Sequence, residues 1–265
     1  GPPYFDAVFV PVMTPILFLM AAGPFARWKE ASVAEIARAL RWAIAAGVVV
    51  AIALPLIYGR WSALTAMGLF FAAWVVVASL LNFVERVQHT RAGRSFLSAV
   101  LKQPRSFVGM HTAHIGIAVF VVGVTMVNSF QEENDIKMAP GDTTTVAGYS
   151  FKFNGVKAVE GPNYVAAQGD FDLAVNGKFV RKMNPEKRNY HSSAMPMTEA
   201  SIDAGFLRDV YVSLGEPIDR DKPEGEWAVR VYYKPFVDWI WGGCVLMALG
   251  GLLAMLDRRY RVKSR

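Results

Sequence analysis

The chain has 265 residues, of which 53% are hydrophobic and 19% are charged, and its mean hydropathy is +0.27. This composition is too apolar for an ordinary soluble domain and too charged for a protein that lies in the membrane throughout. The formal net charge is +6. Because the basic residues gather beside apolar runs, they indicate membrane topology and argue against a nucleic-acid-binding protein.

Apolar runs long enough to cross a hydrocarbon core of roughly 30 Å predict about five transmembrane α-helices. The expected spans are 7–22, 42–56, 63–84, 107–127 and 236–256. The first run contains Pro11 and Pro15, and the second is short and ends near Pro55, so kinks or tight packing are expected there.

The basic residues suggest an orientation. They lie in segments 27–41 and 86–105 and after the last run, at 258–265. If the helices alternate, these segments share one side, which the positive-inside rule assigns to the cytoplasm. We therefore expect 1–129 to form four spans, 130–234 an extracytoplasmic domain, and 235–265 the final span and a basic tail.

The extracytoplasmic segment changes from helical to alternating periodicity, which predicts an inserted antiparallel β domain. Strands are expected at 149–153, 171–175, 209–214 and 227–233. Asn154-Gly155 and Asn176-Gly177 each follow an alternating stretch, and both pairs favour a type I′ hairpin turn. The only cysteine, Cys244, lies in the last apolar run, so no disulfide framework is predicted.

A charged cluster lies inside the β domain. The stretch "NPEKRNYH" contains Glu186, Lys187, Arg188, Tyr190 and His191. Charge runs usually face water, so one interpretation is a solvated loop. The other is a docking surface for a partner or for anionic groups such as carboxylates.

Two histidines lie inside the fourth apolar run, "FVGMHTAHIGIAVFVVGVTM". His114 is about 12 Å along the helix from its cytoplasmic end, within hydrocarbon. An ionisable residue at that depth indicates a functional site, and neutral imidazole is a ligand for haem iron. Two imidazoles side by side on one helix cannot lie trans across one iron, so a second axial histidine would come from elsewhere.

The structural alternative is that each histidine only donates a hydrogen bond to a neighbouring helix, worth on the order of 1 kcal/mol. His111 is nearer the membrane interface and is the weaker candidate ligand. No other predicted span contains a histidine, because His89 and His191 lie outside the spans.

Several stretches together resemble the C-terminal part of the CcmF family, the haem lyase subunits of the bacterial cytochrome c maturation system. The resemblance covers essentially the whole chain. It is carried by "GPPYFDAVFVPVM", "VGMHTAHIGIAVFVVGVT", "NPEKRNYHSSAMPMTEASIDAGFLRDVYVSLGEP" and "WAVRVYYKPFVDWIWGGCVLMALGGLLAMLDRRYR".

The resemblance implies attachment of a substrate haem to the thiols of a CxxCH sequence in apocytochrome c. It implies partners CcmH and the haem chaperone CcmE, a place in the bacterial inner membrane, and a β domain in the periplasm. It also implies a permanent haem b that reduces the incoming haem iron. His114, in "AHIG", matches the second axial ligand of that haem.

The family's first transmembrane haem ligand, its tryptophan-rich segment and its periplasmic histidines have no counterpart here. We therefore expect the C-terminal piece of a longer or split protein, completed by the upstream N-terminal portion of CcmF. No catalytic residue is assigned, and activity of this piece alone is left open. The alternative function is a non-catalytic membrane scaffold whose β domain recruits apocytochrome-handling partners.

Overall fold

The computed structural model describes residues 4–26, 32–91, 93, 95–193, 195–219, 221–222 and 224–257. Several basic residues used for the topology prediction, Arg27, Lys29, Arg94 and those of 258–265, lie outside these ranges. The chain forms two compact units. One contains Gly1–Ser129 with Asp238–Arg265, and the other contains Phe130–Val237.

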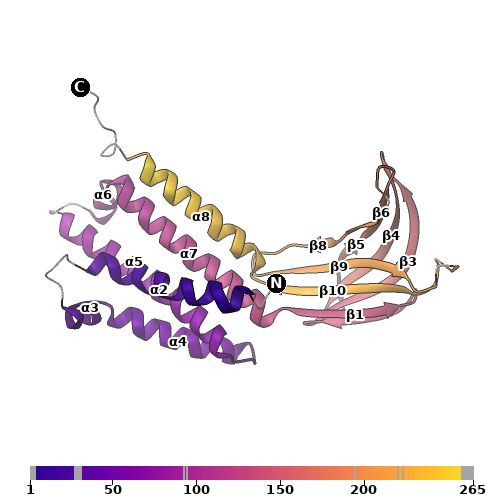
Figure 1. The fold of residues 1–265 in the computed structure, drawn as a ribbon, viewed down its shortest axis with the longest axis horizontal. Coiled ribbons are helices and arrows are strands. Elements are labelled where there is room, and N and C mark those ends of the chain that lie inside the picture. The colour runs from indigo at the N-terminus through magenta and orange to yellow at the C-terminus, as the bar shows by residue number, and fades with distance from the viewer. Residues whose placement is uncertain are drawn as a thin grey trace, which may run out of the picture. The chain divides into compact units, whose positions relative to one another are not determined.

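The first unit is helical (Figure 1). Its elements are η1 (Phe5–Phe9), α2 (Val10–Ala22), η2 (Gly23–Phe25), α3 (Val33–Ala39), α4 (Arg41–Ile57), α5 (Ala63–Thr90), α6 (Phe96–Leu101), α7 (Arg105–Phe130) and α8 (Val237–Met255). Within the described residues, four helical segments are long and apolar enough to cross a membrane, and the bent pair α3–α4 makes a fifth if it is one span. The expectation of about five spans is confirmed.

Helix α5 packs against α2 and α4 in the helical unit. Trp74 of α5 stacks on Phe18 of α2 at 5.7 Å, and its indole N–H donates to the Phe18 carbonyl. On the α4 side, a Cβ added to Gly47 would lie 2.7 Å from the Phe70 ring. Close approach at a small residue is how helices gain packing contacts in lipid.

The second unit is an antiparallel β sandwich. Among the described residues, one sheet has the order β1 (Glu132–Met138), β10 (Trp227–Pro235), β9 (Arg208–Pro217) and β8 (Ser201–Asp203). The other has the order β2 (Thr143–Val146), β3 (Tyr149–Glu160), β4 (Tyr164–Val175), β6 (Glu186–Tyr190) and β7 (Met197–Glu199), and β5 (Lys178–Met183) also pairs with β4.

The two sheets share one core. Phe151, Phe153 and Phe171 from one sheet pack with Val212 and Val231 from the other, and all five are fully buried. This confirms that residues 149–153 alternate onto a buried face. The strands expected at 209–214 and 227–233 are also confirmed, as parts of β9 and β10.

The two Asn-Gly pairs behave differently. Asn176 and Gly177 have φ angles of 50° and 75° and join β4 to β5, so this hairpin prediction is confirmed. The prediction at Asn154-Gly155 is wrong, because β3 continues through the pair and the register with β4 shifts there as a bulge. The residues after the bulge pair again with β4, which favours a continuous strand over a reversal.

Candidate functional site

The intramembrane histidines lie on α7 where it packs against α5. Thr65 and Ser129 share a hydrogen bond of 2.7 Å between their hydroxyl oxygens, and Phe83 stacks on Phe107 with ring centroids 5.6 Å apart. These contacts join the start of each helix to the end of the other, so the two helices are antiparallel.

His111 is enclosed in this helix contact. Its side chain is 4% exposed and packs edge-on against Phe107 at 4.4 Å and Phe83 at 5.5 Å between ring centroids. Neither ring nitrogen has a hydrogen-bond partner among the described residues. The interpretation that His111 hydrogen-bonds across to a neighbouring helix is therefore not supported.

His114 is one helical turn further along α7 and is half-buried. Its ring centroid lies 6.3 Å from that of His111, with an angle of 78° between the ring planes. Its Nδ1 is buried, and no described group bonds to it. The structure thus brings the two predicted histidines together and leaves His114 the more accessible.

Ser79 is a third polar residue at this contact, and the sequence reasoning missed it. It is 4% exposed on α5, and its hydroxyl oxygen has no partner among the described residues. Ser79 lies one turn from Phe83, on the face of α5 that meets α7. The sequence held no signal that ranks Ser79 above the other polar residues of this span, such as Asn82.

The opposite side of α7 packs against α8 through glycines. A Cβ added to Gly116 would lie 2.6 Å from the Met247 amide nitrogen, and one added to Gly243 would lie 2.5 Å from that of Phe120. Two turns away along both helices, Gly109 and Gly250 face one another in the same way. The contact with α8 therefore holds α7 on the side opposite the histidines, and this keeps the histidine side in position.

The residues of this site fit one axial position of a haem. A macrocycle cannot reach the His111 nitrogens past the two phenylalanine rings that pack against them. His114 is partly exposed, and imidazole is a common axial ligand of haem iron. The described residues hold no group of three or more His, Cys, Asp or Glu side chains that could bind a metal ion.

The charged cluster of the β domain is a strand, β6, so the solvated-loop interpretation is wrong. Glu186, Arg188 and Tyr190 come together, with Arg188 Nε 2.7 Å from Glu186 and its Nη1 donating to Tyr190. Lys187 instead pairs with Glu216 at 3.0 Å and donates to Thr198. His191 follows β6 in an exposed turn.

Hydrogen bonding inside this cluster outweighs burial. Burial alone would raise the pKa of the Glu186 carboxyl, but hydrogen bonds donated by Arg188 and Gln168 lower that pKa below its ordinary value. The charges of β6 therefore stabilise the sheet itself, which leaves little to attract an anionic partner.

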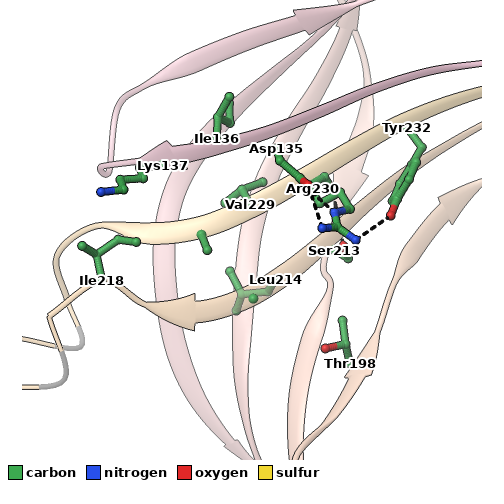
Figure 2. A pocket seen from close by; sticks show the side chains of 12 residues that line it. Asp135, Ile136, Lys137, Thr198, Ser213, Leu214, Ile218, Val229, Arg230 and Tyr232 are labelled. Atoms are coloured by element: carbon green, nitrogen blue, oxygen red, sulfur yellow. Dashed lines mark hydrogen bonds and ion pairs between the residues drawn. The ribbon is translucent and has the colours of Figure 1, made fainter.

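A shallow groove of about 630 Å³ lies on the sandwich (Figure 2). It is lined by residues of β1, β9 and β10 with Thr198 and Ile218. Two cations, Lys137 and Arg230, line it. Arg230 donates to both carboxylate oxygens of Asp135, lies 3.2 Å from Glu133 and bonds to Tyr232. Two carboxylates therefore already neutralise Arg230 in this groove.

Comparisons with known proteins agree with this architecture. A family model described as the CcmF C-terminal beta-sandwich matches residues 129–235. The cytochrome c-type biogenesis protein CcmF of Pseudomonas aeruginosa is 42% identical over 100% of this chain and 39% of its own length. The Escherichia coli protein of the same name is 37% identical over 98% of the chain and 38% of its own length.

One solved structure, named cytochrome c heme lyase CcmF, has the same fold with a TM-score of 0.76. It is 22% identical, over 97% of this chain and 41% of the other. The fold and site define an integral-membrane protein. A β sandwich is inserted between its last two described spans, α7 and α8, and α7 carries two histidines. The chain belongs to the CcmF family as its C-terminal portion, and spans about 39% of the length of the curated relatives it matches.

Proposed function

We propose that this chain is the C-terminal part of a haem lyase of cytochrome c biogenesis and that His114 supplies one axial ligand to a haem b in the membrane. The second ligand comes from the upstream portion of CcmF. The observation that carries the proposal is a half-buried imidazole at membrane depth whose buried Nδ1 has no partner among the described residues.

The two histidines receive different roles. His111 packs edge-on against the stacked pair Phe83 and Phe107 and is 4% exposed, so it supports the position of α7 and does not face the site. His114 lies beside it with an exposed edge, so its imidazole presents a nitrogen to the iron. The glycine contact with α8 keeps this edge in place.

When bound, haem b supplies one-electron reduction of the iron of the incoming substrate haem. Neutral imidazole is the form that binds iron, and α7 holds His114 at this depth of the span. The substrate haem, delivered by CcmE, is joined to the CxxCH thiols of an apocytochrome c brought by CcmH. This takes place beside the β domain, on the periplasmic side of the bacterial inner membrane.

The scaffold alternative needs β6 to present charge to a partner. The charged groups of Lys187 and Arg188 are instead paired with Glu216 and Glu186. This observation favours the haem-ligand function. If complex assembly failed on Lys187→Ala while His114→Ala kept full haem, the scaffold function would take its place.

The test is the visible absorption spectrum, oxidised and reduced with dithionite, of the chain produced together with its upstream portion. In His114→Ala, low-spin b-type bands should be lost or strongly weakened. In the matched variant His111→Leu, which replaces an imidazole by an apolar side chain of similar size, the bands should remain. Unchanged bands and haem content in His114→Ala would contradict the proposal.

A further inference from the structure

The turn between β8 and β9 exposes two large apolar side chains. Phe206 is 76% exposed and Leu207 is 54% exposed. Single exposed apolar residues are common, but two adjacent ones at the tip of a turn form a compact apolar projection. Neither residue belongs to the buried core cluster of the sandwich.

The turn that carries them is held by polar contacts on both sides. The Gly205 N–H donates to Asp209 at 3.0 Å, and the Arg208 N–H donates to the Gly205 carbonyl. The Arg208 guanidinium lies 2.7 Å from the Asp203 carboxylate and donates to the Tyr149 hydroxyl at 2.7 Å. The apolar pair is therefore presented on an ordered turn, so contact with it entails little loss of backbone entropy.

The turn is also bonded to the residue that precedes α8, within the same compact unit. The Leu207 carbonyl accepts a hydrogen bond of 2.8 Å from the N–H of Phe236, which has a φ of 57°. The next residue, Val237, begins α8. With 19 residues, α8 is about 28 Å long, so its whole length is needed to cross the hydrocarbon core. Its first residue therefore lies at the lipid interface.

We propose that Phe206 and Leu207 insert into the lipid interface at the start of α8 and hold the β8–β9 turn against the membrane. Because Phe236 directly precedes α8, its hydrogen bond to Leu207 places the apolar pair next to the lipid interface. The occupant of this apolar tip is thus phospholipid.

The experiment uses the chain with its upstream portion in nanodiscs of phosphatidylcholine and phosphatidylglycerol. In a Cys244→Ser background, Phe206→Cys is labelled with a nitroxide, and its collisions with oxygen and with a water-soluble nickel chelate are measured. Ile218→Cys is the matched control. Ile218 is 42% exposed and follows the other end of β9, about 30 Å from Arg208.

The ratio of oxygen to nickel collisions should be several-fold higher at position 206 than at 218. Leu207→Cys provides a second probe of the same tip if the first variant does not fold. Equal ratios at the tip and the control would overturn the proposal. A label shielded from both reagents would also overturn it, because this would indicate a protein partner on the turn.

Discussion

The β sandwich and the histidine region of the α5–α7 contact treat buried polar groups differently. In the sandwich, Asp209 is 4% exposed and accepts hydrogen bonds from Gly205 and Tyr211. In the helical unit, Ser79, His111 and His114 have buried polar atoms without partners among the described residues. Since an unsatisfied buried group destabilises a fold by about 1–3 kcal/mol, the contrast supports the proposal that this region of the α5–α7 contact binds a ligand.

The sandwich core and the α7–α8 contact also differ in the size of the residues that pack there. The sandwich core is filled by large rings, such as Phe153 and Phe171, stacked 4.8 Å apart. The α7–α8 contact is instead made by glycines that let two backbones meet. Large side chains should therefore dominate the stability of the sandwich core, and small residues that of the α7–α8 contact.

The largest expected effect is in the sandwich core. Phe171 is fully buried, so Phe171→Ala should lower the free energy of unfolding of the sandwich by about 3–5 kcal/mol. Hydrogen exchange of β4 amides in a urea series on the full chain measures it. Phe179→Ala, at a site 62% exposed in β5, is the control and should have a small effect. Equal losses in the two variants would break the contrast between core and surface.

The next effect tests the glycine contact. In Gly243→Val the new side chain would meet the backbone of α7, so the helices must separate, with a loss of about 1–3 kcal/mol. Gly242→Val is a close control, because a Cβ at Gly242 meets nothing within 4 Å. Thermal denaturation in detergent should show a lower midpoint for Gly243→Val alone. A matching drop in Gly242→Val would mean that β-branching in α8, rather than contact with α7, is responsible.

A smaller effect separates two arginines that bind the same carboxylate. Arg208 bonds to Asp203 and Tyr149 and is partly buried, so Arg208→Ala should reduce sandwich stability by about 2 kcal/mol. Arg181 lies 3.5 Å from Asp203 but is 53% exposed, so Arg181→Ala should reduce it by less than about 1 kcal/mol. Urea midpoints of the two variants provide the comparison, and the reverse order would contradict the assignment of Arg208 as the anchor of the turn.

The smallest effect depends on pH. Because hydrogen bonds lower the pKa of Glu186 in the folded state, its ionised form stabilises the sheet above the unfolded pKa of about 4.3, and this stabilisation is lost as the pH falls through the folded pKa. Glu186→Gln should therefore be less stable than wild type at pH 7, by about 1 kcal/mol or less. The difference should shrink at lower pH, and urea midpoints across that range measure it. A gap that widened on acidification would show that the sign is wrong.

Much of the fold could be predicted because its signals are local. The length of an apolar run predicts a transmembrane span, and the alternation of apolar and polar residues predicts a strand. Asn154-Gly155 was misread because an Asn-Gly pair fits both a hairpin and a bulge, and pairing with β4 decides between them. The hairpin at Ala147 and Gly148, with φ angles of 47° and 81°, carries a weaker turn signal and was missed.

The candidate site was predicted in part for a similar reason. A histidine in an apolar helix is visible in the sequence, so His111 and His114 could both be named. Their difference in exposure is set by Phe83 on another helix. Ser79 could not be ranked from the sequence, because serine is common in transmembrane helices and only its burial without a hydrogen-bond partner singles it out.

The most direct measurement is rescue by imidazole of the chain produced with its upstream portion. His114→Gly leaves room for a free imidazole at the position of the lost ligand, and His111→Gly is the matched control. Added imidazole should restore reduced low-spin b-type bands in His114→Gly, while His111→Gly should keep them without imidazole. Full low-spin bands in His114→Gly before any imidazole is added would contradict the central claim that His114 holds the iron.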